Sequence, residues 1–489
     1  MQEKSLKKNF ELRKSFFTNR ASAVFPIYFR SKQNDLILSW LNYWVIKNDI
    51  SHSNLAINIR IYDHNGVLFT TNQVELQKYN NTLSVRSFVQ QESFEGMIEI
   101  EIISIENIRF TFPAIIGFYK TGSFYSCVHS AGRFKGPDEE HSVSISEETN
   151  WSCKFSSGIT PFFHYVNGNT DAEVNLKVNL KSEEGVTIST IDVNEKFNAF
   201  GSKVYFFDEI MPNIFTKEGM FIGVECSNNN VFRRMVVGNY HKALKHMEVT
   251  HSFPRQKSID YCPKNEHGAE SFLALYNDPN LSLDVRVFPT NCEGKFLVKE
   301  SNQDYEALAL DDENDSTFLR LGFGTIDLER QFRSKVLWLY GDTVPSRLNC
   351  NFIYKVKDTN SAFSTDIATG AKSSVYPPKF SHWGSGVNGN GYDFALMIRN
   401  LNHNQDCLAA KGTLMVYGDD FKIEHAVEVS ANSSSSILFS DLIEQEKLDY
   451  FSDHEVIFSW FLELDQPNSE TFWVSFRKED GCIVGEHGF

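Results

Sequence analysis

The sequence is poor in several features that would otherwise point to a class of protein. Its 489 residues include only 13 prolines and 8 cysteines, and no two cysteines form a Cys-x-x-Cys pair. No apolar run approaches the roughly 20 residues that span a bilayer. Lys7, Glu11 and Lys14 interrupt any secretory signal. We therefore expect reduced thiols in a cytoplasmic protein without a transmembrane segment, with export by an unconventional route left open.

Positive charge is also scarce. The chain has 47 Lys and Arg against 63 Asp and Glu, which gives a formal net charge of −16. Contacts with phosphates need clustered basic side chains, so the balance disfavours a nucleic-acid or anionic-membrane binder. The exception is a basic arm over residues 1–20, which we expect to be a frayed or surface-docked terminus or a peptide that docks on a partner. Its basic residues are Lys4, Lys7, Lys8, Arg13, Lys14 and Arg20.

The chain does contain a segment that occurs twice, at residues 115–133 and 236–255. Each copy pairs two aliphatic residues with Gly and, two residues on, Tyr, and each ends on His-Ser-x-x-Arg. The copies are offset by 121 residues at the start (236 − 115) and by 122 at the histidine (251 − 129), so one insertion separates them. We interpret the segment as the closing hairpin of a domain that is repeated along the chain.

Short alternating stretches predict the fold class. Ile57, Ile59 and Ile61 alternate with polar residues, and Asn65-Gly66 then supplies a turn that tolerates the positive φ of a type I′ hairpin. Similar stretches recur at residues 174–180, 281–287 and 414–416. Closely spaced strands without long helical periodicity predict an all-β chain of tandem antiparallel β-sandwich domains, about four related units behind the short basic N-terminal arm.

The recurrence of these stretches also predicts the boundaries of the repeated domains. We place the repeats at residues 21–135, 150–256, 266–354 and 392–489, with a Ser-, Gly- and Asn-rich linker at 355–391.

The third repeat allows two registers. In the preferred one, Val336 and Tyr340 match Val236 and Tyr240, which keeps the unit lengths similar and puts Asn351 where His251 stands. In the other, residues 363–372 match 124–133, and Ala368 replaces His129. Either register removes the histidine from the third repeat.

The repeated His-Ser-x-x-Arg residues are the best candidates for a ligand site. An imidazole and a guanidinium at the end of a hairpin could bind a carboxylate, sulfate or phosphate. Alternatively the His and Ser cap strand ends and the Arg pairs with a local carboxylate, and we favour this structural role. The residues are His129, Ser130, Arg133, His251, Ser252 and Arg255.

Trp151 and Trp383 are further candidates because both stand in polar segments. They could stack on sugar rings or pack against a neighbouring domain.

Three other patterns are rejected. Residues 384–389 match Gly-x-Gly-x-x-Gly but lack the strand and helix that a dinucleotide site needs. His241, His246 and His251 recur at a spacing that does not put all three on one face of a hairpin. The acidic run 311–315 lacks the glycine of an EF-hand loop. We expect no metal and no cofactor.

Without a recognised catalytic motif, the leading hypothesis is a non-catalytic protein that binds a protein partner or an anionic glycan. The alternatives are a carbohydrate-active enzyme with its site between two sandwiches and a structural subunit of a larger assembly. The sequence leaves the oligomeric state open.

Overall fold

The structure is a computed structural model of the chain. It describes residues 17–76, 78–109, 113–129, 132–134, 146–149, 151–183, 185–226, 234–254, 264–265, 268–274, 278–287, 295–300, 317–320, 324–327, 336–341, 347–372, 379–400, 408–431, 433–443, 454–467 and 469–489.

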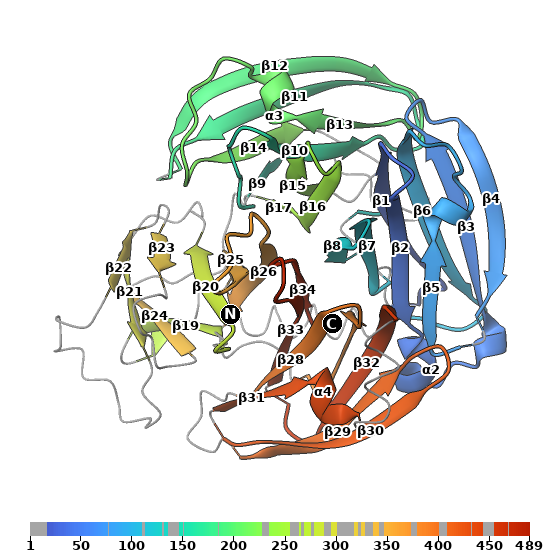
Figure 1. Ribbon diagram of the computed structural model, residues 1–489, viewed down its shortest axis with the longest axis vertical. Helices are drawn as coiled ribbons and strands as arrows, with labels where there is room; N and C mark the ends of the chain where they lie inside the picture. The colour runs from blue at the N-terminus through green and yellow to red at the C-terminus, as the bar shows by residue number, and fades with distance from the viewer. Residues whose placement is uncertain are drawn as a thin grey trace.

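Strands dominate the described residues, where they form seven antiparallel sheets. Figure 1 shows four groups of strands arranged around a common centre, in chain order from blue to red. The predicted class, tandem antiparallel β-sandwiches, is confirmed. Residues 1–16 of the predicted basic arm lie outside the described residues.

The first sandwich consists of two four-stranded sheets, with strand orders β1-β6-β3-β4 and β5-β2-β7-β8. Its strands are β1 (Arg20–Phe29), β2 (Asn34–Leu41), β3 (Leu55–Asp63), β4 (Leu68–Glu75), β5 (Asn80–Ser84), β6 (Phe94–Ser104), β7 (Ile115–Thr121) and β8 (Phe124–His129).

The second sandwich repeats this order, with sheets β12-β11-β14-β9-β17 and β13-β10-β15-β16. Its strands are β9 (Ser146–Thr149), β10 (Ile159–Val166), β11 (Ala172–Lys181), β12 (Thr187–Phe197), β13 (Ser202–Phe206), β14 (Phe221–Cys226), β15 (Val236–His241), β16 (His246–His251) and β17 (Phe253–Pro254).

The fourth sandwich has the same order again, with sheets β27-β32-β29-β30 and β31-β28-β33-β34. Its strands are β27 (Ser381–Asn388), β28 (Tyr392–Asn400), β29 (Ala410–Tyr417), β30 (Lys422–Val429), β31 (Ser433–Leu438), β32 (Val456–Leu464), β33 (Ser469–Arg477) and β34 (Ile483–His487).

The third group differs, because its described strands join one nine-stranded sheet. They are β18 (Lys264–Asn265), β19 (Gly268–Ala274), β20 (Leu281–Val287), β21 (Lys295–Glu300), β22 (Thr317–Arg320), β23 (Gly324–Asp327), β24 (Val336–Gly341), β25 (Arg347–Val356) and β26 (Thr365–Lys372).

Helices are short and lie between strands. They are α2 (Tyr43–Asn48), α3 (Phe207–Ile210), α4 (Phe439–Leu442) and the 3-10 turns η1 (His52–Asn54) and η2 (Val85–Ser87). None of those among the described residues has the length and apolar character needed to cross a membrane.

The alternation seen in the sequence places the core. Ile59 on β3 pairs with Ile100 on β6, and both side chains are buried in the first sandwich.

The turn after β3 uses Gly66, whose φ is +82°. The backbone oxygen of Ala199 in the second sandwich lies so close to Gly66 that a Cβ would collide with it. Asn65 keeps a negative φ, so the hairpin is confirmed but its type I′ turn is not.

The closing hairpins of the four groups meet at the centre (Figure 1). Strand β8 contacts β16, β16 contacts β26, β26 contacts β34, and β34 contacts β8. These four strands form a closed ring, which we call the central ring. Side chains hydrogen-bond across it: Thr250 Oγ1 donates to Asp366 O at 3.2 Å, and Thr365 Oγ1 donates to Gly485 O at 3.3 Å.

The preferred register of the third repeat is wrong. Strand β24, which contains Val336 and Tyr340, pairs with β19 and β21, whereas the hairpin at the central ring is β25–β26. Its loop has eight residues, 357–364, where the first hairpin has two, 122–123, and this insertion hid the match. In the four closing hairpins, His129 pairs with Ile116, His251 with Val236, Ala368 with Asn351, and His487 with Phe472.

The predicted linker at 355–391 also needs correction, since it contains β26 and β27. The Gly-x-Gly-x-x-Gly residues lie mostly on β27 itself. A Cβ at Gly384 would collide with the Trp460 ring, so this glycine allows close packing rather than loop flexibility.

Candidate metal centre

Three histidines meet at the central ring, each at the last residue of a closing strand. His129 ends β8, His251 ends β16 and His487 ends β34. Because the three sandwiches share one strand order, the last strand of each closing hairpin comes to the centre, and each of these strands ends on a histidine. We call these three residues the histidine hub.

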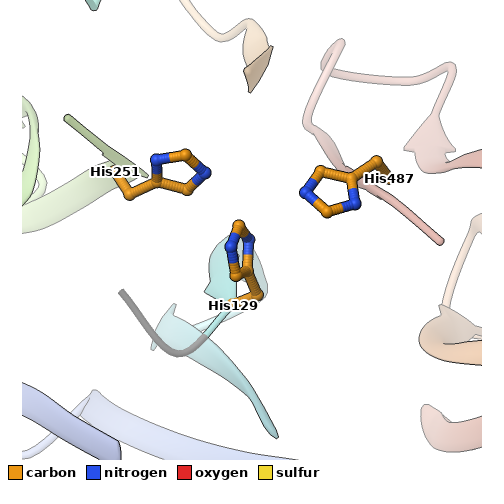
Figure 2. A group of neighbouring side chains, drawn as sticks. All are labelled: His129, His251 and His487. Atoms are coloured by element: carbon orange, nitrogen blue, oxygen red, sulfur yellow. The ribbon is translucent and has the colours of Figure 1, made fainter. Parts of the chain in front are cut away.

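The rings converge closely. Each residue offers one ligand atom, and these atoms all lie within 4.8 Å of one another. The ring of His129 is 4.4 Å from that of His251 and 4.8 Å from that of His487, centroid to centroid, and both contacts are edge-on. Figure 2 shows His251 and His487 facing each other from opposite sides, with His129 between them on a third side.

The Nδ1 atom of each ring is already engaged. It lies 2.9 Å from Glu486 Oε2 in His129, 3.0 Å from Ser252 O in His251, and 3.1 Å from Gly488 O in His487. All three partners accept hydrogen bonds, so Nδ1 carries the hydrogen and Nε2 keeps its lone pair. This is the arrangement that fixes metal-binding histidines in their tautomer and orientation.

Burial sets the charges of the hub. Burial lowers the pKa of His251 well below its usual range, and the neighbouring His129 lowers it further. Burial also lowers the pKa of His487, to about 4. Burial raises the pKa of Glu486, but His129 and His487 outweigh this and bring it down to about 2. At neutral pH His251 and His487 therefore offer neutral imidazole nitrogens near an ionised carboxylate, the protonation state that metal binding requires.

One nitrogen of the hub is unsatisfied. Within the described part of the chain, Nε2 of His251 is buried and has no hydrogen-bond partner. A buried polar atom without a partner lowers the stability of the folded state by about 1 to 3 kcal/mol unless a ligand binds it. The second oxygen of Glu486 lies 3.7 Å from Nε2 of His487, outside hydrogen-bonding distance.

Of the other residues predicted as ligand-binding, Ser252 directly follows His251, and Arg133 lies four residues after His129. Ser252 Oγ donates to Glu148 Oε2 and accepts from the backbone N–H of Met235, both buried contacts. Arg133 is buried. Ser130, Arg255 and the acidic run 311–315 lie outside the described residues.

The two tryptophans are both buried, which favours packing over sugar stacking. Trp151 belongs to the core of the second sandwich. Trp383 stacks on Tyr43 of α2 with the ring centroids 4.5 Å apart, and the Lys47 ammonium lies over its ring. Trp383 thus joins the fourth sandwich to the first.

His241 and His246 do not reach the hub. His241 lies 2.9 Å from the Glu248 carboxylate, and His246 Nδ1 lies 3.2 Å from Thr121 Oγ1. Only His251 of that trio lies in the hub. The spacing argued against a site made of all three histidines, and it did not single out His251. His487 was missed as a site residue, although the shared order His-x-Phe at 251–253 and 487–489 could have revealed it.

Comparisons with known proteins add little. No family model and no curated protein matches the sequence. Among solved structures, a calcium-binding mutant of β-glucuronidase 2 from Bacteroides uniformis is 10% identical, over 54% of this chain and 28% of that one, with a TM-score of 0.12. A second Bacteroides uniformis β-glucuronidase matches 52% of this chain and 28% of its own at the same identity and TM-score. Scores this low carry no argument about fold or function.

Proposed function

We propose that the protein binds a divalent transition-metal ion at the histidine hub. The observation that supports this most directly is the set of three imidazoles with ligand atoms within 4.8 Å, each with Nδ1 held by an oxygen acceptor. The proposal departs from the sequence-based expectation of no metal, because that expectation considered histidines within one hairpin and not across repeats.

The donor set favours one group of ions. Neutral imidazoles suit zinc, copper, nickel and iron, whereas magnesium and calcium prefer oxygen ligands. Zinc binds imidazole nitrogen at about 2.0–2.1 Å, so a tetrahedral ion holds its ligand atoms roughly 3.4 Å apart. The hub's ligand atoms lie within 4.8 Å of one another, so they would have to approach by at most about 1.4 Å to reach that spacing.

The ion would tie distant parts of the chain together. Its ligands are 122 residues apart (251 − 129) and 236 residues apart (487 − 251), and they come from the first, second and fourth sandwiches. A ligand that binds only this folded arrangement stabilises it, by about 2.7 kcal/mol at a free concentration 100 times Kd. We propose that the metal closes the central ring.

Calorimetric titration of chelator-treated protein with zinc tests the proposal. The wild type should bind one ion, and His129→Ala, His251→Ala and His487→Ala should each lose more affinity than the roughly 10- to 100-fold that outer-shell changes cost. His64→Ala removes an exposed histidine and should bind as the wild type does. Equal zinc binding by all four variants and the wild type would overturn the proposal.

The sequence-based hypothesis of a binding protein for a protein partner or an anionic glycan stays a prediction, as do its enzyme and assembly alternatives. An anion at His129 would lie beside the ionised Glu486, which is unfavourable. Exposed apolar side chains on the outer strands, such as Phe69 on β4 and Ile188 on β12, suit a protein partner better. A glycan array should therefore show no acidic glycan bound, and a specific hit would favour the glycan.

A further inference from the structure

The sheet β1-β6-β3-β4 of the first sandwich ends on β4, whose only neighbour among the described strands is β3. Figure 1 shows β4 on the outside of the molecule, away from the central ring. The strand at the other end of the sheet, β1, is already contacted by the chain itself, since Val24 donates its backbone N–H to Gly132 O at 2.8 Å. The edge of β4 therefore offers backbone donors and acceptors to an added strand.

Strand β4 lacks the features that commonly prevent edge strands from pairing. Edges in natural proteins are often blocked by charged side chains or by proline. Residues 68–74 of β4 carry no charge and include no proline. The side chains of Leu68 and Phe69 are 49% and 40% exposed, and that of Val67, just before the strand, is 61% exposed. An uncharged edge with exposed apolar side chains favours pairing with another strand.

The equivalent edges of the other two sandwiches are better protected. Strand β30 occupies the same place in the fourth sandwich, and it exposes the charged residues Lys422, Glu424 and Glu428. Strand β12 occupies it in the second sandwich, where exposed Asp192 and Lys196 follow an uncharged first half. Since the three sandwiches share one strand order, the open edge of β4 comes from its own sequence and not from the architecture.

We propose that β4 is a self-association surface, on which β4 of a second copy of this chain pairs antiparallel about a two-fold axis. This inference is independent of the proposed metal binding. The chain has a net charge of −16, so two copies approach most easily where the facing surfaces are uncharged. A pairing centred on Thr71 places Leu68 opposite Val74 and brings no two like charges of the strand together. Two-fold pairing of this kind closes on itself, so it gives a dimer and not a fibre.

Analytical ultracentrifugation of the full-length protein tests this surface. The wild type should show a concentration-dependent equilibrium between monomer and dimer. Added salt should shift it toward the dimer, because salt screens the repulsion between two acidic molecules. Thr71→Lys places two like charges face to face and should weaken dimerisation at least about tenfold. Thr190→Lys on β12 and Ala426→Lys on β30, both at exposed positions, should dimerise as the wild type does.

Hydrogen exchange of the wild-type protein locates the interface without any substitution. Dimerisation should slow the exchange of backbone amides in β4 and leave those of β12 and β30 unchanged. A protein that stays monomeric at every concentration and salt level would overturn the proposal and leave the edge to a strand of another protein. A dimer that Thr71→Lys leaves intact, that Thr190→Lys dissociates, or that leaves β4 unprotected would also overturn it.

Discussion

Nδ1 of His129 lies 2.9 Å from Oε2 of Glu486, although 357 residues separate them in the chain. Both side chains are buried, and the contact joins β8 of the first sandwich to β34 of the fourth. Glu486 directly precedes His487 in β34. This strand therefore supplies one histidine of the hub, His487, and the carboxylate that orients another, His129. This carboxylate–histidine contact has the form of the outer shell of a metal centre.

Replacing that carboxylate should weaken metal binding without removing a ligand. We expect Glu486→Gln to reduce zinc affinity about 10- to 100-fold, because a neutral amide raises the basicity of His129 less than a carboxylate does. Glu424→Gln, at an exposed position on β30, should bind zinc as the wild type does. Calorimetric titration measures both, and an unchanged affinity in Glu486→Gln would contradict an outer-shell role.

His164 should make the fold sensitive to acid. It is buried on β10, and burial lowers its pKa to about 3, below the usual 6.5 of an unfolded chain. The unfolded state therefore binds the proton more readily between these values. The contribution of neutral His164 to the free energy of unfolding is complete above pH 6.5. It falls as the pH drops toward 3, and about 2 kcal/mol of it is lost at pH 5.

Urea unfolding at pH 7 and pH 5 measures this effect. His164→Leu should reduce the loss of unfolding free energy between the two pH values by about 2 kcal/mol, whereas the exposed His64→Leu should leave it unchanged. An identical pH dependence in wild type and His164→Leu would show that His164 is not the group responsible.

The fourth sandwich should not tolerate a methyl group at Gly386. A Cβ there would lie 2.5 Å from Cδ2 of Phe394 and 2.9 Å from Cζ of Phe458, both in the core. We expect Gly386→Ala to lower the free energy of unfolding by about 1 to 3 kcal/mol through overpacking. Asp420→Ala, in an exposed turn, serves as the control in chemical denaturation. A Gly386→Ala protein as stable as the control would contradict this packing.

The thiols should be reduced but protected. Cys127, Cys153, Cys226, Cys350 and Cys482 are buried and free of disulfides. Burial raises the pKa of Cys127, Cys153, Cys350 and Cys482, the last to about 12, so these thiols of the native protein should react slowly with a thiol reagent. After denaturation without a reductant, all eight cysteines of the chain should react. Two or more unreactive cysteines would indicate a disulfide.

The fold could be predicted because it depends on local patterns. Alternating residues such as Ile57, Ile59 and Ile61 place one face of a strand in the core, and a glycine at a turn sets the hairpin. These signals need no knowledge of distant residues. The third repeat was misread where a longer hairpin loop broke the constant offset between repeats.

The hub could be predicted only in part. The sequence showed that His129 and His251 are equivalent and that the third repeat lacks the histidine. It could not show that the closing strands meet, because that depends on how the sandwiches pack around one centre. The same limit hid His487, whose hairpin lacks the Gly and Tyr of the first two copies.

Crystallography of the zinc-loaded protein, with data collected on both sides of the zinc absorption edge, tests metal binding most directly. We predict one anomalous peak inside the central ring, about 2.0–2.1 Å from a nitrogen of each of His129, His251 and His487. An anomalous map without a peak between these three rings, from crystals soaked in zinc at neutral pH, would contradict the account.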